Sequence, residues 1–429
     1  MKNIEQLHFN FHKTLFEEIC SQEKLLEAFR EVKRNKGAPG IDDIKISDFA
    51  QDIDKELAQL KQELESWSYK PQPVKLVEIT KNGGGTRRLG IPTVRDRVIQ
   101  TSIKNALESI IDPTFSKNSY GFRPGRSQKH AISAAKEIVA EGKKYVVDLD
   151  LSKFFDRINH DRLVQKLKNY TDDTKILRLI GMTLRCGVLE NGKVKKTKIG
   201  TVQGSPLSPL LSNVVLDELD KELEARKLAF CRYADDCNIY LGSLKAAERV
   251  RKSITNFIEK KLKLMVNEEK TKVTQTKFTQ FLGMTILTIG VIISNKSILK
   301  ARAKLITLIP RSTNKPVEKT IEEFNLWYRG WSNYFNMTDS PEQLSGIEAH
   351  ARRRIRAQFI RNQKKRRHLY RKFVKRGVHK RTSAKYAFSN KKTWDLSKST
   401  PAHQAWPNRY FREIGMYCCT GKEKKKIKK

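Results

Sequence analysis

The first 300 residues predict an α+β fold, and the rest of the chain predicts a basic helical region. Strand and helix patterns in the first part are mixed without strict alternation, which favours α+β over a parallel α/β sheet. Strand patterns become sparse after Lys300, and more than half of the formal net charge of +39 lies in residues 301–429. Both changes predict a domain boundary near residue 300.

The elements of the first part follow from periodicity and turn residues. Apolar residues at helical spacing predict helices, and short apolar runs predict strands. Ser205 and Pro206 are suited to the N-cap and the first position of a helix. The expected elements are helices over 95–111 and 127–140, a strand over 145–151, a helix after Ser205, a hairpin over 228–241, a helix over 244–262 and extended chain over 266–273.

Two helices with distinct faces are expected beyond residue 300. Residues 318–335 place aromatic side chains on neighbouring turns. Residues 344–359 predict an amphipathic helix with an arginine-rich face opposite an apolar stripe. The stripe consists of Leu344, Ile347, Ala351, Ile355 and Phe359. The lysine run at the C-terminus predicts a frayed tail.

Composition narrows the class of protein. A net charge of +39 exceeds what solubility requires, so a polyanionic partner is expected. The sequence has no apolar run of about 18 residues and no secretion-signal pattern at the N-terminus, so we expect a cytoplasmic protein with no membrane partner. The six cysteines form no C-x-x-C pair, which argues against a disulfide framework or a zinc ribbon.

The residues best suited to chemistry are Asp235 and Asp236, at the turn of the expected hairpin. Adjacent carboxylates repel each other unless a cation lies beside them. Mg²⁺ prefers oxygen ligands and usually binds one or two carboxylates together with substrate phosphates. Phosphoryl transfer is therefore one interpretation of this pair, and an exposed turn without function is the other.

A second acidic cluster lies on the expected strand over 145–151. Asp148 and Asp150 share one face of that strand because side chains two residues apart point the same way. If the strand lies beside the hairpin, Asp150, Asp235 and Asp236 together suit two metal ions that clamp an in-line displacement. Residues 81–88 add a glycine-rich turn with cations suited to a triphosphate, although a plain hairpin is the simpler interpretation.

Several long motifs resemble one family. DLDLSKFFDRINHD, TVQGSPLSPLLSN and RYADD, in this order, resemble the catalytic blocks of bacterial group II intron-encoded proteins, which are reverse transcriptases and splicing maturases. RRLGIPTVRDRVIQ and SYGFRPGRSQKHAI resemble two upstream blocks of that family. FLGM, GWSNYF and SNKKTWDLSKSTPAHQAWPNRYF resemble its thumb and maturase region. The resemblance covers nearly the whole chain.

The resemblance implies a right-hand polymerase with fingers, palm and thumb, followed by a basic helical region. It implies an N-terminal extension over 1–30, fingers and palm over 31–300, a thumb and maturase domain over 301–385 and a nucleic-acid-binding segment over 386–429. Many members end in an endonuclease domain with paired cysteines and histidines, and Cys418-Cys419 does not reproduce that arrangement. We therefore expect no cleavage of the second DNA strand.

The resemblance also assigns roles in the catalytic site. Asp150, Asp235 and Asp236 match the family's catalytic aspartates, which bind two Mg²⁺ ions, with Mn²⁺ as a substitute. Asp148 does not fit the family's spacing and is interpreted as a supporting acid. The residues that match nucleotide-binding positions are Lys81 and Arg87 for the triphosphate, Phe155 for exclusion of the 2′-hydroxyl, and Gln203 with Gly204 for the nascent base pair.

Nucleic-acid contacts are assigned to arginines. Arg123 matches a block that contacts the template, and a structural ion pair is an equally good interpretation of it. RNA recognition is expected to rest on backbone and shape. The candidate phosphate contacts on the arginine-rich helix face are Arg352, Arg353, Arg354, Arg356 and Arg361.

The expected activity is RNA-directed DNA synthesis, combined with binding of intron RNA for splicing and retrohoming. The expected partners are intron RNA or another RNA template, a DNA primer and target, and dNTPs. A non-catalytic RNA-binding splicing factor is one alternative. A related reverse transcriptase with a host role in defence or repair is another. The oligomeric state is not predicted, with a dimer as one option.

Overall fold

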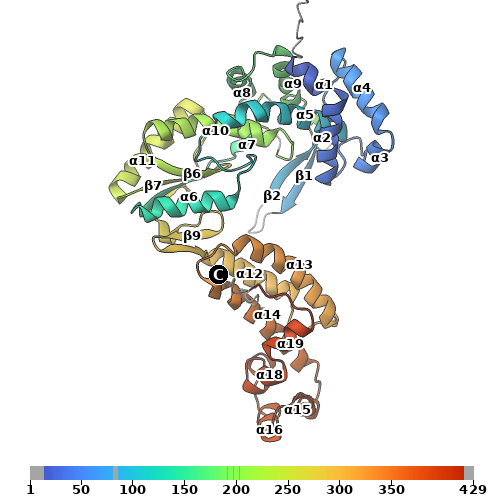
Figure 1. Ribbon diagram of the computed structural model, residues 1–429, viewed down its shortest axis with the longest axis vertical. Coiled ribbons are helices and arrows are strands. Elements are labelled where there is room, and N and C mark those ends of the chain that lie inside the picture. The colour runs from blue at the N-terminus through green and yellow to red at the C-terminus, as the bar shows by residue number, and fades with distance from the viewer. Residues whose placement is uncertain (1–13, 81–85, 191, 197, 202, 420–429) are drawn as a thin grey trace, which may run out of the picture. The chain divides into compact units, whose positions relative to one another are not determined.

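The structure of the protein is a computed structural model that describes residues 14–80, 86–190, 192–196, 198–201 and 203–419. The chain divides into two compact units (Figure 1). The first unit contains residues up to 138 and 142–275, and the second contains 139–141 and the chain from Thr276 onward. This division falls earlier in the chain than the boundary predicted near residue 300. Lys81 and the lysine tail lie outside the described residues.

A helical layer opens the first unit. Helix α5 runs through it and is buried along much of its length, and α1 and α2 pack against it. Thr93 caps α5 by accepting a hydrogen bond from the backbone N–H of Asp96, as expected for a threonine before a helix. The helices are α1 (Leu15–Cys20), α2 (Gln22–Arg34), α3 (Ile46–Gln51), α4 (Ile53–Glu65) and α5 (Val94–Ile111).

Two four-stranded sheets follow. The first has the order β2-β1-β4-β5 and is built from β1 (Val74–Thr80), β2 (Thr86–Ile91), β4 (Val188–Glu190) and β5 (Lys193–Lys195). The second has the order β6-β7-β3-β8 and is antiparallel throughout. Its strands are β3 (Tyr145–Leu149), β6 (Ala229–Tyr233), β7 (Asp236–Leu241) and β8 (Lys272–Gln275). The predicted strand and hairpin are therefore confirmed.

Helices cover the second sheet. Helix α11 packs against β3, β7 and β8, and α10 packs against β6. Most buried positions of its strands are apolar, and Val146, Val147, Phe230 and Ile239 have no exposed surface. The helices here are α6 (Gln128–Ala140), α7 (Phe154–Arg157), α8 (His160–Leu167), α9 (Thr174–Leu184), α10 (Ser208–Ala225) and α11 (Leu244–Phe257), which continues as a π-helical turn over Ile258–Leu262.

The predicted start of the helix after Ser205 is wrong. Helix α10 begins at Ser208, with Pro209 in its first turn. The Ser205 hydroxyl instead donates a hydrogen bond to the Gln100 side chain at 2.7 Å and accepts one from the backbone N–H of Leu207. This segment contains two Ser-Pro pairs. Ser205-Pro206 lies before the helix, and Ser208-Pro209 begins it.

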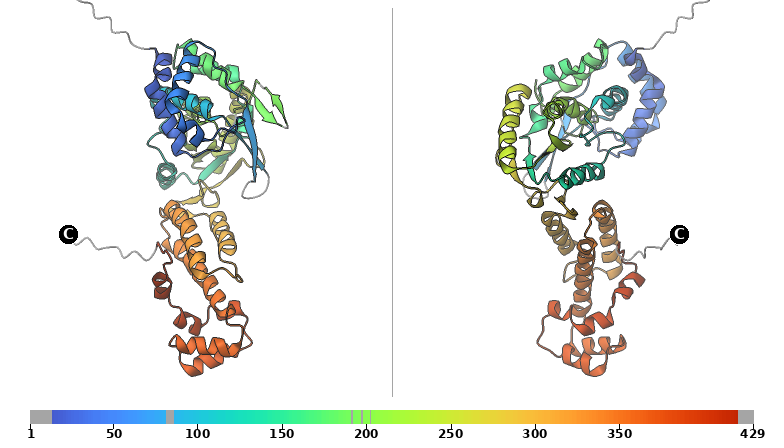
Figure 2. Two further views of the ribbon diagram at one scale, coloured as in Figure 1. Left: turned by 90° about the vertical axis from the view of Figure 1, so that its right-hand side faces the viewer. Right: turned by 60° about the vertical axis from the view of Figure 1, so that its left-hand side comes forward.

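The second unit is mainly helical (Figure 2). A short hairpin of β9 (Met284–Leu287) and β10 (Gly290–Ile293) precedes its helices. The aromatic helix predicted over 318–335 is confirmed as α13, with Phe324 and Tyr328 fully buried. The helices are α12 (Asn295–Leu308), α13 (Val317–Phe335), α14 (Pro341–Arg361), α15 (Arg366–Lys375), α16 (Lys380–Ala387), α17 (Thr393–Leu396), α18 (Thr400–Ala405) and α19 (Asn408–Glu413).

Helix α14 carries the predicted apolar stripe. Leu344, Ile347, Ala351 and Ile355 are buried, and Phe359 is half-buried against Trp406. Across both units, the described helices include none that is long and apolar enough to cross a bilayer.

Candidate active site

The register of the second sheet brings the candidate aspartates together. Leu149 of β3 pairs with Cys237 of β7. Asp150 directly follows Leu149, and Asp236 directly precedes Cys237, so the two aspartates lie opposite each other where the strand pair ends. Asp235 lies beside them in the turn between β6 and β7. Segments about 85 residues apart in sequence thus converge at one end of one sheet.

Asp148 shares the face of Asp150 and Asp236. It pairs with Asn238 of β7, and directly opposed residues on antiparallel strands point to the same side. Burial, followed by the charges of Asp236 and Asp150, raises the pKa of Asp148 to about 6. The acidic cluster therefore contains Asp148 as well as the three residues predicted to bind metal.

Asp236 is in a similarly unfavourable electrostatic environment. The surrounding protein removes part of its hydration, and the charges of Asp235 and Asp150 add to this effect, raising its pKa to about 6. Lys270 acts in the opposite direction on Asp236. Its ammonium nitrogen lies 3.1 Å from Oδ2 of Asp150. The positive charge near the cluster does not balance its carboxylates, and Lys270 supplies part of the charge that is needed.

The loop that carries Lys270 also fixes the backbone of Asp150. The N–H of Asn267 donates to the Asp150 carbonyl at 2.8 Å, and the N–H of Asp150 donates to Thr271 Oγ1 at 3.2 Å. The end of β3 is therefore held by residues that follow α11, far along the chain. These contacts fix the backbone of Asp150, whose carboxylate pairs with Lys270.

The donor set of this cluster suits a hard divalent cation. Carboxylate oxygens are the ligands preferred by Mg²⁺ and Mn²⁺, and a cation between these groups would relieve the repulsion that raises their pKa values. Among the residues that the structure describes, no three acidic, histidine or cysteine side chains are already close enough to enclose a metal ion. The chemistry of the residues fits a metal, while the side chains are not preassembled around one point.

A buried arginine holds the hairpin turn. Arg232 has no exposed surface and pairs with Asp220 of α10, donating from Nε at 2.7 Å and from a terminal nitrogen at 2.5 Å. It also donates to the carbonyl of Ala234 at 2.9 Å, inside the turn. Ala234 adopts a left-handed backbone conformation with φ 57°, which these contacts stabilise. Asn213 and Ser119 complete the set of partners.

The sequence interpretation missed this arginine and its partners. The available signal was a charged residue inside an otherwise apolar strand, since a buried charge needs a paired acid. The partner acid, Asp220, lies on a helix with no distinguishing pattern. Arg232 is a positioning residue because it contacts the turn and not the reacting groups.

The loop over 118–121 packs directly against the same turn. The N–H of Tyr120 donates to the Arg232 carbonyl at 2.9 Å, and the N–H of Arg232 donates to the Asn118 carbonyl at 2.9 Å. A Cβ atom on Gly121 would lie 2.2 Å from the backbone nitrogen of Ala234. Only glycine permits this close approach.

The contacts of Arg123 fit the structural interpretation of this residue, and the template contact stays a prediction. Arg123 is 8% exposed and pairs with Asp112 at 2.6 Å. It also donates to the carbonyls of Ser116 and Ser119. Its guanidinium thus holds the loop that packs against the turn of Asp235 and Asp236.

Two protein-family models match consecutive parts of the chain. Residues 79–286 match the family model described as reverse transcriptase (RNA-dependent DNA polymerase), and residues 298–377 match the one described as group II intron, maturase-specific domain. Protein YkfC of Escherichia coli (strain K12) is 33% identical over 295 residues, covering 59% of this chain and 77% of that protein. Group II intron-encoded protein LtrA of Lactococcus lactis subsp. cremoris is 36% identical over 249 residues.

The chain belongs to the group II intron reverse transcriptases. This family consists of RNA-directed DNA polymerases that use divalent metal ions and carry a maturase domain. The match to LtrA covers 57% of this chain and 40% of that protein. The putative COX1/OXI3 intron 1 protein of Saccharomyces cerevisiae is 29% identical over 287 residues, covering 54% of this chain and 34% of that protein. The chain therefore spans less than half the length of these two relatives.

Three of the residues predicted to bind the nucleotide lie in the described part of the chain. Phe155 is half-buried and packs edge-on against the buried Phe154. Gln203 is half-buried, and its carbonyl accepts a 2.7 Å hydrogen bond from the N–H of Gly90 in β2. Arg87 is exposed on β2. Lys81 lies outside the described residues.

Gly204 allows the close contact between β2 and the loop after residue 202. Its φ of +113° is unfavourable for other residues, and a Cβ atom there would lie 2.5 Å from the Gly90 carbonyl oxygen. This contact places Gln203 next to the strand that carries Arg87. The position of Gln203 therefore depends on the position of the strand that carries Arg87.

A groove of about 790 Å³ adjoins the hairpin turn of this reverse transcriptase, which carries Asp235 and Asp236. Tyr233, Gly204 and Phe122 line it on the catalytic side. Arg97 lines it from α5, is 7% exposed, and has a buried Nε with no partner in the described part of the chain.

The arginine-rich face predicted on α14 of the maturase region is wrong in part. Arg352, Arg354 and Arg356 are buried. Arg354 donates to the Ile309 carbonyl, and Arg356 donates to the Trp406 carbonyl. Both arginines therefore hold the backbone of segments that pack against α14. Arg352 pairs with the buried Glu348 at 3.5 Å.

The remaining two residues of that set differ from these three. Arg353 is half-buried, with its guanidinium 3.7 Å from the centre of the Trp394 ring. Arg361 is exposed at the end of α14. The fully exposed cations of this region lie mostly beyond α14, at Lys364, Lys365, Arg366, Arg367, Arg371, Lys375, Arg376, Lys380, Arg381 and Lys385.

Proposed function

We propose that this protein synthesises DNA on an RNA template at the acidic cluster formed by Asp150, Asp235 and Asp236. The observation that carries the proposal is the strand register, which brings Asp150 and the hairpin aspartates to one end of a sheet inside a reverse transcriptase domain. Carboxylates held this close are unfavourable for stability, so a role in cation binding accounts for them.

The three aspartates would hold two divalent ions, Mg²⁺ or Mn²⁺. When bound, such ions stabilise the attacking and leaving oxygens of an in-line phosphoryl transfer. The backbone contacts of Asn267 and Thr271 orient Asp150, and Arg232 orients the turn that carries Asp235 and Asp236. The protein thus contributes mainly positioning, which this reaction requires.

The residues around the cluster have complementary tasks. Arg87 and Lys81 bind the triphosphate of the incoming nucleotide by charge. Phe155 lies against the sugar and excludes a 2′-hydroxyl, and Gln203 lines the nascent base pair. The groove beside Tyr233 accepts the template strand, because Arg34, Arg97 and Arg126 line it and suit contacts with phosphates.

The basic surface of α15 and α16 binds intron RNA through phosphates. Its exposed cations have no carboxylate partner in the described part of the chain, and this surface lies within or directly after the maturase match. It replaces Arg352, Arg354 and Arg356 as the proposed contact. Such binding assists splicing and retrohoming, and we expect both activities in the cytoplasm of a bacterium.

Primer extension on poly(rA)/oligo(dT) with Mg²⁺ tests the polymerase proposal. Wild-type protein is expected to incorporate dTTP and to reject UTP, and the Asp235→Ala/Asp236→Ala variant is expected to lose incorporation while it keeps RNA binding. The matched control is Glu268→Ala/Glu269→Ala, which removes two adjacent exposed acids from the neighbouring loop. Extension by the aspartate variant would contradict the proposal, and inactivity of wild-type protein would favour a non-catalytic splicing factor.

A further inference from the structure

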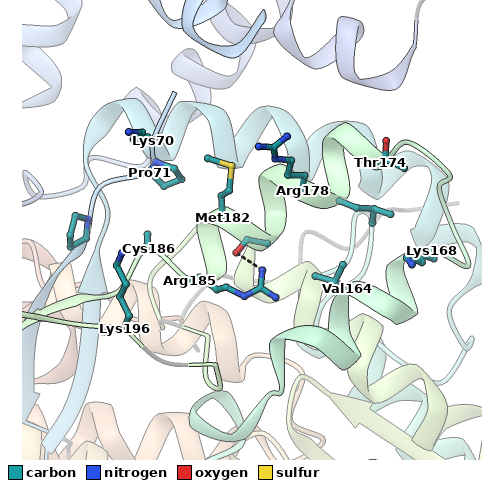
Figure 3. A pocket seen from close by; sticks show the side chains of 13 residues that line it. Lys70, Pro71, Val164, Lys168, Thr174, Arg178, Met182, Arg185, Cys186 and Lys196 are labelled. Atoms are coloured by element: carbon teal, nitrogen blue, oxygen red, sulfur yellow. Dashed lines mark hydrogen bonds between the residues drawn. The ribbon is translucent and has the colours of Figure 1, made fainter. Parts of the chain in front are cut away.

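A basic cleft lies in the first unit (Figure 3). Its volume is about 660 Å³, within the range typical of ligand sites. It is lined by α8, α9, the segment before β1, Cys186 and Lys196. No strand of the second sheet and no residue of the 203–206 loop contributes to its lining. The cleft is therefore separate from the catalytic site and from the groove at Arg97.

Positive charge surrounds this cleft without any acid in its lining. In Figure 3 the charged side chains lie around Met182, which is central among the lining residues. An isolated patch of this composition is unfavourable in the free protein because like charges repel. Its five cations are Lys70, Lys168, Arg178, Arg185 and Lys196.

Two of the five cations are held in place by other residues. The Arg178 guanidinium lies over the Trp67 ring at 4.8 Å from its centre, and Trp67 itself stacks on Phe16. Arg185 pairs with Asp161 and donates to the Gly181 carbonyl at 3.4 Å. Such restraints reduce the entropy that a guanidinium loses when it binds an anion.

The other three cations are free to bind a ligand. Lys70, Lys168 and Lys196 are exposed, and none has an ion-pair partner among the residues that the structure describes. Three unpaired lysines around one cleft favour a ligand with several separated negative charges over a single small anion.

The interior of the cleft is apolar. Met182, Leu177, Val164 and two prolines line it between the cations. Methionine adapts its shape to flat or irregular apolar partners. A free phosphate or a fully paired duplex would leave this surface exposed, whereas an unpaired base would cover it.

We propose that this cleft binds an unpaired nucleotide of RNA, with the base against Met182 and Leu177 and the flanking phosphates against the lysines. The inference rests on the proposed function, because it assumes that RNA is the polyanion this reverse transcriptase handles. It adds an RNA contact that is independent of the template groove and of the basic surface of α15 and α16. A single-stranded or bulged segment suits it, and continuous duplex does not.

RNA binding measured by fluorescence anisotropy at several salt concentrations tests the cleft. The test variant is Lys70→Ala/Lys168→Ala/Lys196→Ala in the full chain, and the matched control is Lys245→Ala/Lys252→Ala/Lys260→Ala, which removes three exposed lysines on and after α11. For a single-stranded RNA, the slope of log affinity against log salt is expected to fall by about 2 in the test variant, at ~0.7 per phosphate contact. The control is expected to keep the wild-type slope.

Photo-crosslinking with 4-thiouridine RNA locates the contact directly. Cross-links on wild-type protein are expected in the peptide that contains Met182, and they are expected to weaken when the RNA is fully paired. Cross-links confined to other peptides, together with an unchanged salt slope in the test variant, would overturn the proposal.

Primer extension on the same proteins separates this inference from the proposed function. The lysine variant is expected to incorporate dTTP at the wild-type rate with saturating template. A wild-type protein that cross-links at Met182 without extending a primer would retain the cleft and remove the polymerase assignment. A protein that extends primers without cross-linking at Met182 would retain the polymerase assignment and remove the cleft.

Discussion

The ammonium nitrogen of Lys270 lies 3.1 Å from Oδ2 of Asp150, one of the three aspartates assigned to catalysis. The lysine is 68% exposed and extends from the loop whose backbone fixes Asp150. Its single charge partly neutralises a cluster that carries four carboxylates. A lysine has one charge and cannot bridge two carboxylates as a divalent ion does. A metal that binds Asp150 must therefore compete with Lys270.

Removal of this lysine is expected to tighten metal binding. In Lys270→Met the competing charge is gone, and an exposed ion pair contributes about 0–1 kcal/mol, so affinity for Mn²⁺ should rise by up to about fivefold. Free Mn²⁺ measured by electron paramagnetic resonance during titration reports the affinity. Lys263→Met, an exposed lysine nearby in sequence, is the control. Unchanged or weaker Mn²⁺ binding in Lys270→Met would contradict competition at Asp150.

The buried pair of Arg232 and Asp220 is expected to dominate the stability of the catalytic turn. Asp220→Ala leaves a fully buried guanidinium without its acid, which costs about 3–5 kcal/mol. The urea midpoint of unfolding should fall clearly. Glu248→Ala breaks the exposed pair with Arg251 and should cost at most about 1 kcal/mol. Equal midpoints for these two variants would show that the buried pair does not hold the turn.

The contact between Gly204 and Gly90 is expected to control nucleotide use. In Gly204→Ala the new Cβ must move away from the Gly90 carbonyl oxygen, which shifts Gln203 relative to β2. Misplacement of a positioning group by 1 Å costs about 100-fold in rate, so kcat/KM for dTTP should fall by at least about tenfold. Gly125→Ala shares a positive φ but meets no atom within 4 Å, so it controls for backbone strain alone. A Gly204→Ala enzyme as active as Gly125→Ala would contradict this role.

The arginines of α14 and α15 are expected to behave differently. Arg354→Ala removes a donor to the Ile309 carbonyl inside the second unit and should lower its melting temperature without changing the salt dependence of RNA binding. Arg366→Ala/Arg367→Ala/Arg371→Ala removes exposed charges and should reduce the salt slope on single-stranded RNA by about 2. A reduced slope in Arg354→Ala, or an unchanged slope in the triple variant, would contradict this division.

Sequence pattern predicted the strand and the hairpin that carry the candidate aspartates. The strand at Asp148–Asp150 and the hairpin at Asp235–Asp236 were identifiable because each is an apolar run with carboxylates at its end. Their pairing was a conditional inference, since the sequence does not state which strands are neighbours. The observed register shows that β3 and β7 are neighbours. It also placed Asp148 on the same face as Asp236, which motif spacing did not indicate.

The arginine-rich face of α14 shows where the sequence was insufficient. A helical pattern identifies one apolar stripe, and it implies that the other faces meet solvent. In the structure, carbonyls at Ile309 and Trp406 also lie against α14, and arginines there satisfy backbone groups that no helix or strand pairs. Arginine side chains can be buried when they donate hydrogen bonds to backbone carbonyls. A high density of arginines in the sequence therefore does not by itself identify a binding surface.

Single-turnover primer extension by Asp150→Asn tests the central claim most directly. This substitution keeps the shape of the side chain and removes one carboxylate from the end of β3, outside the hairpin that carries the other two. The account predicts loss of Mg²⁺-dependent dTTP incorporation with RNA affinity unchanged. Incorporation at the wild-type rate would contradict a single catalytic site formed by Asp150, Asp235 and Asp236.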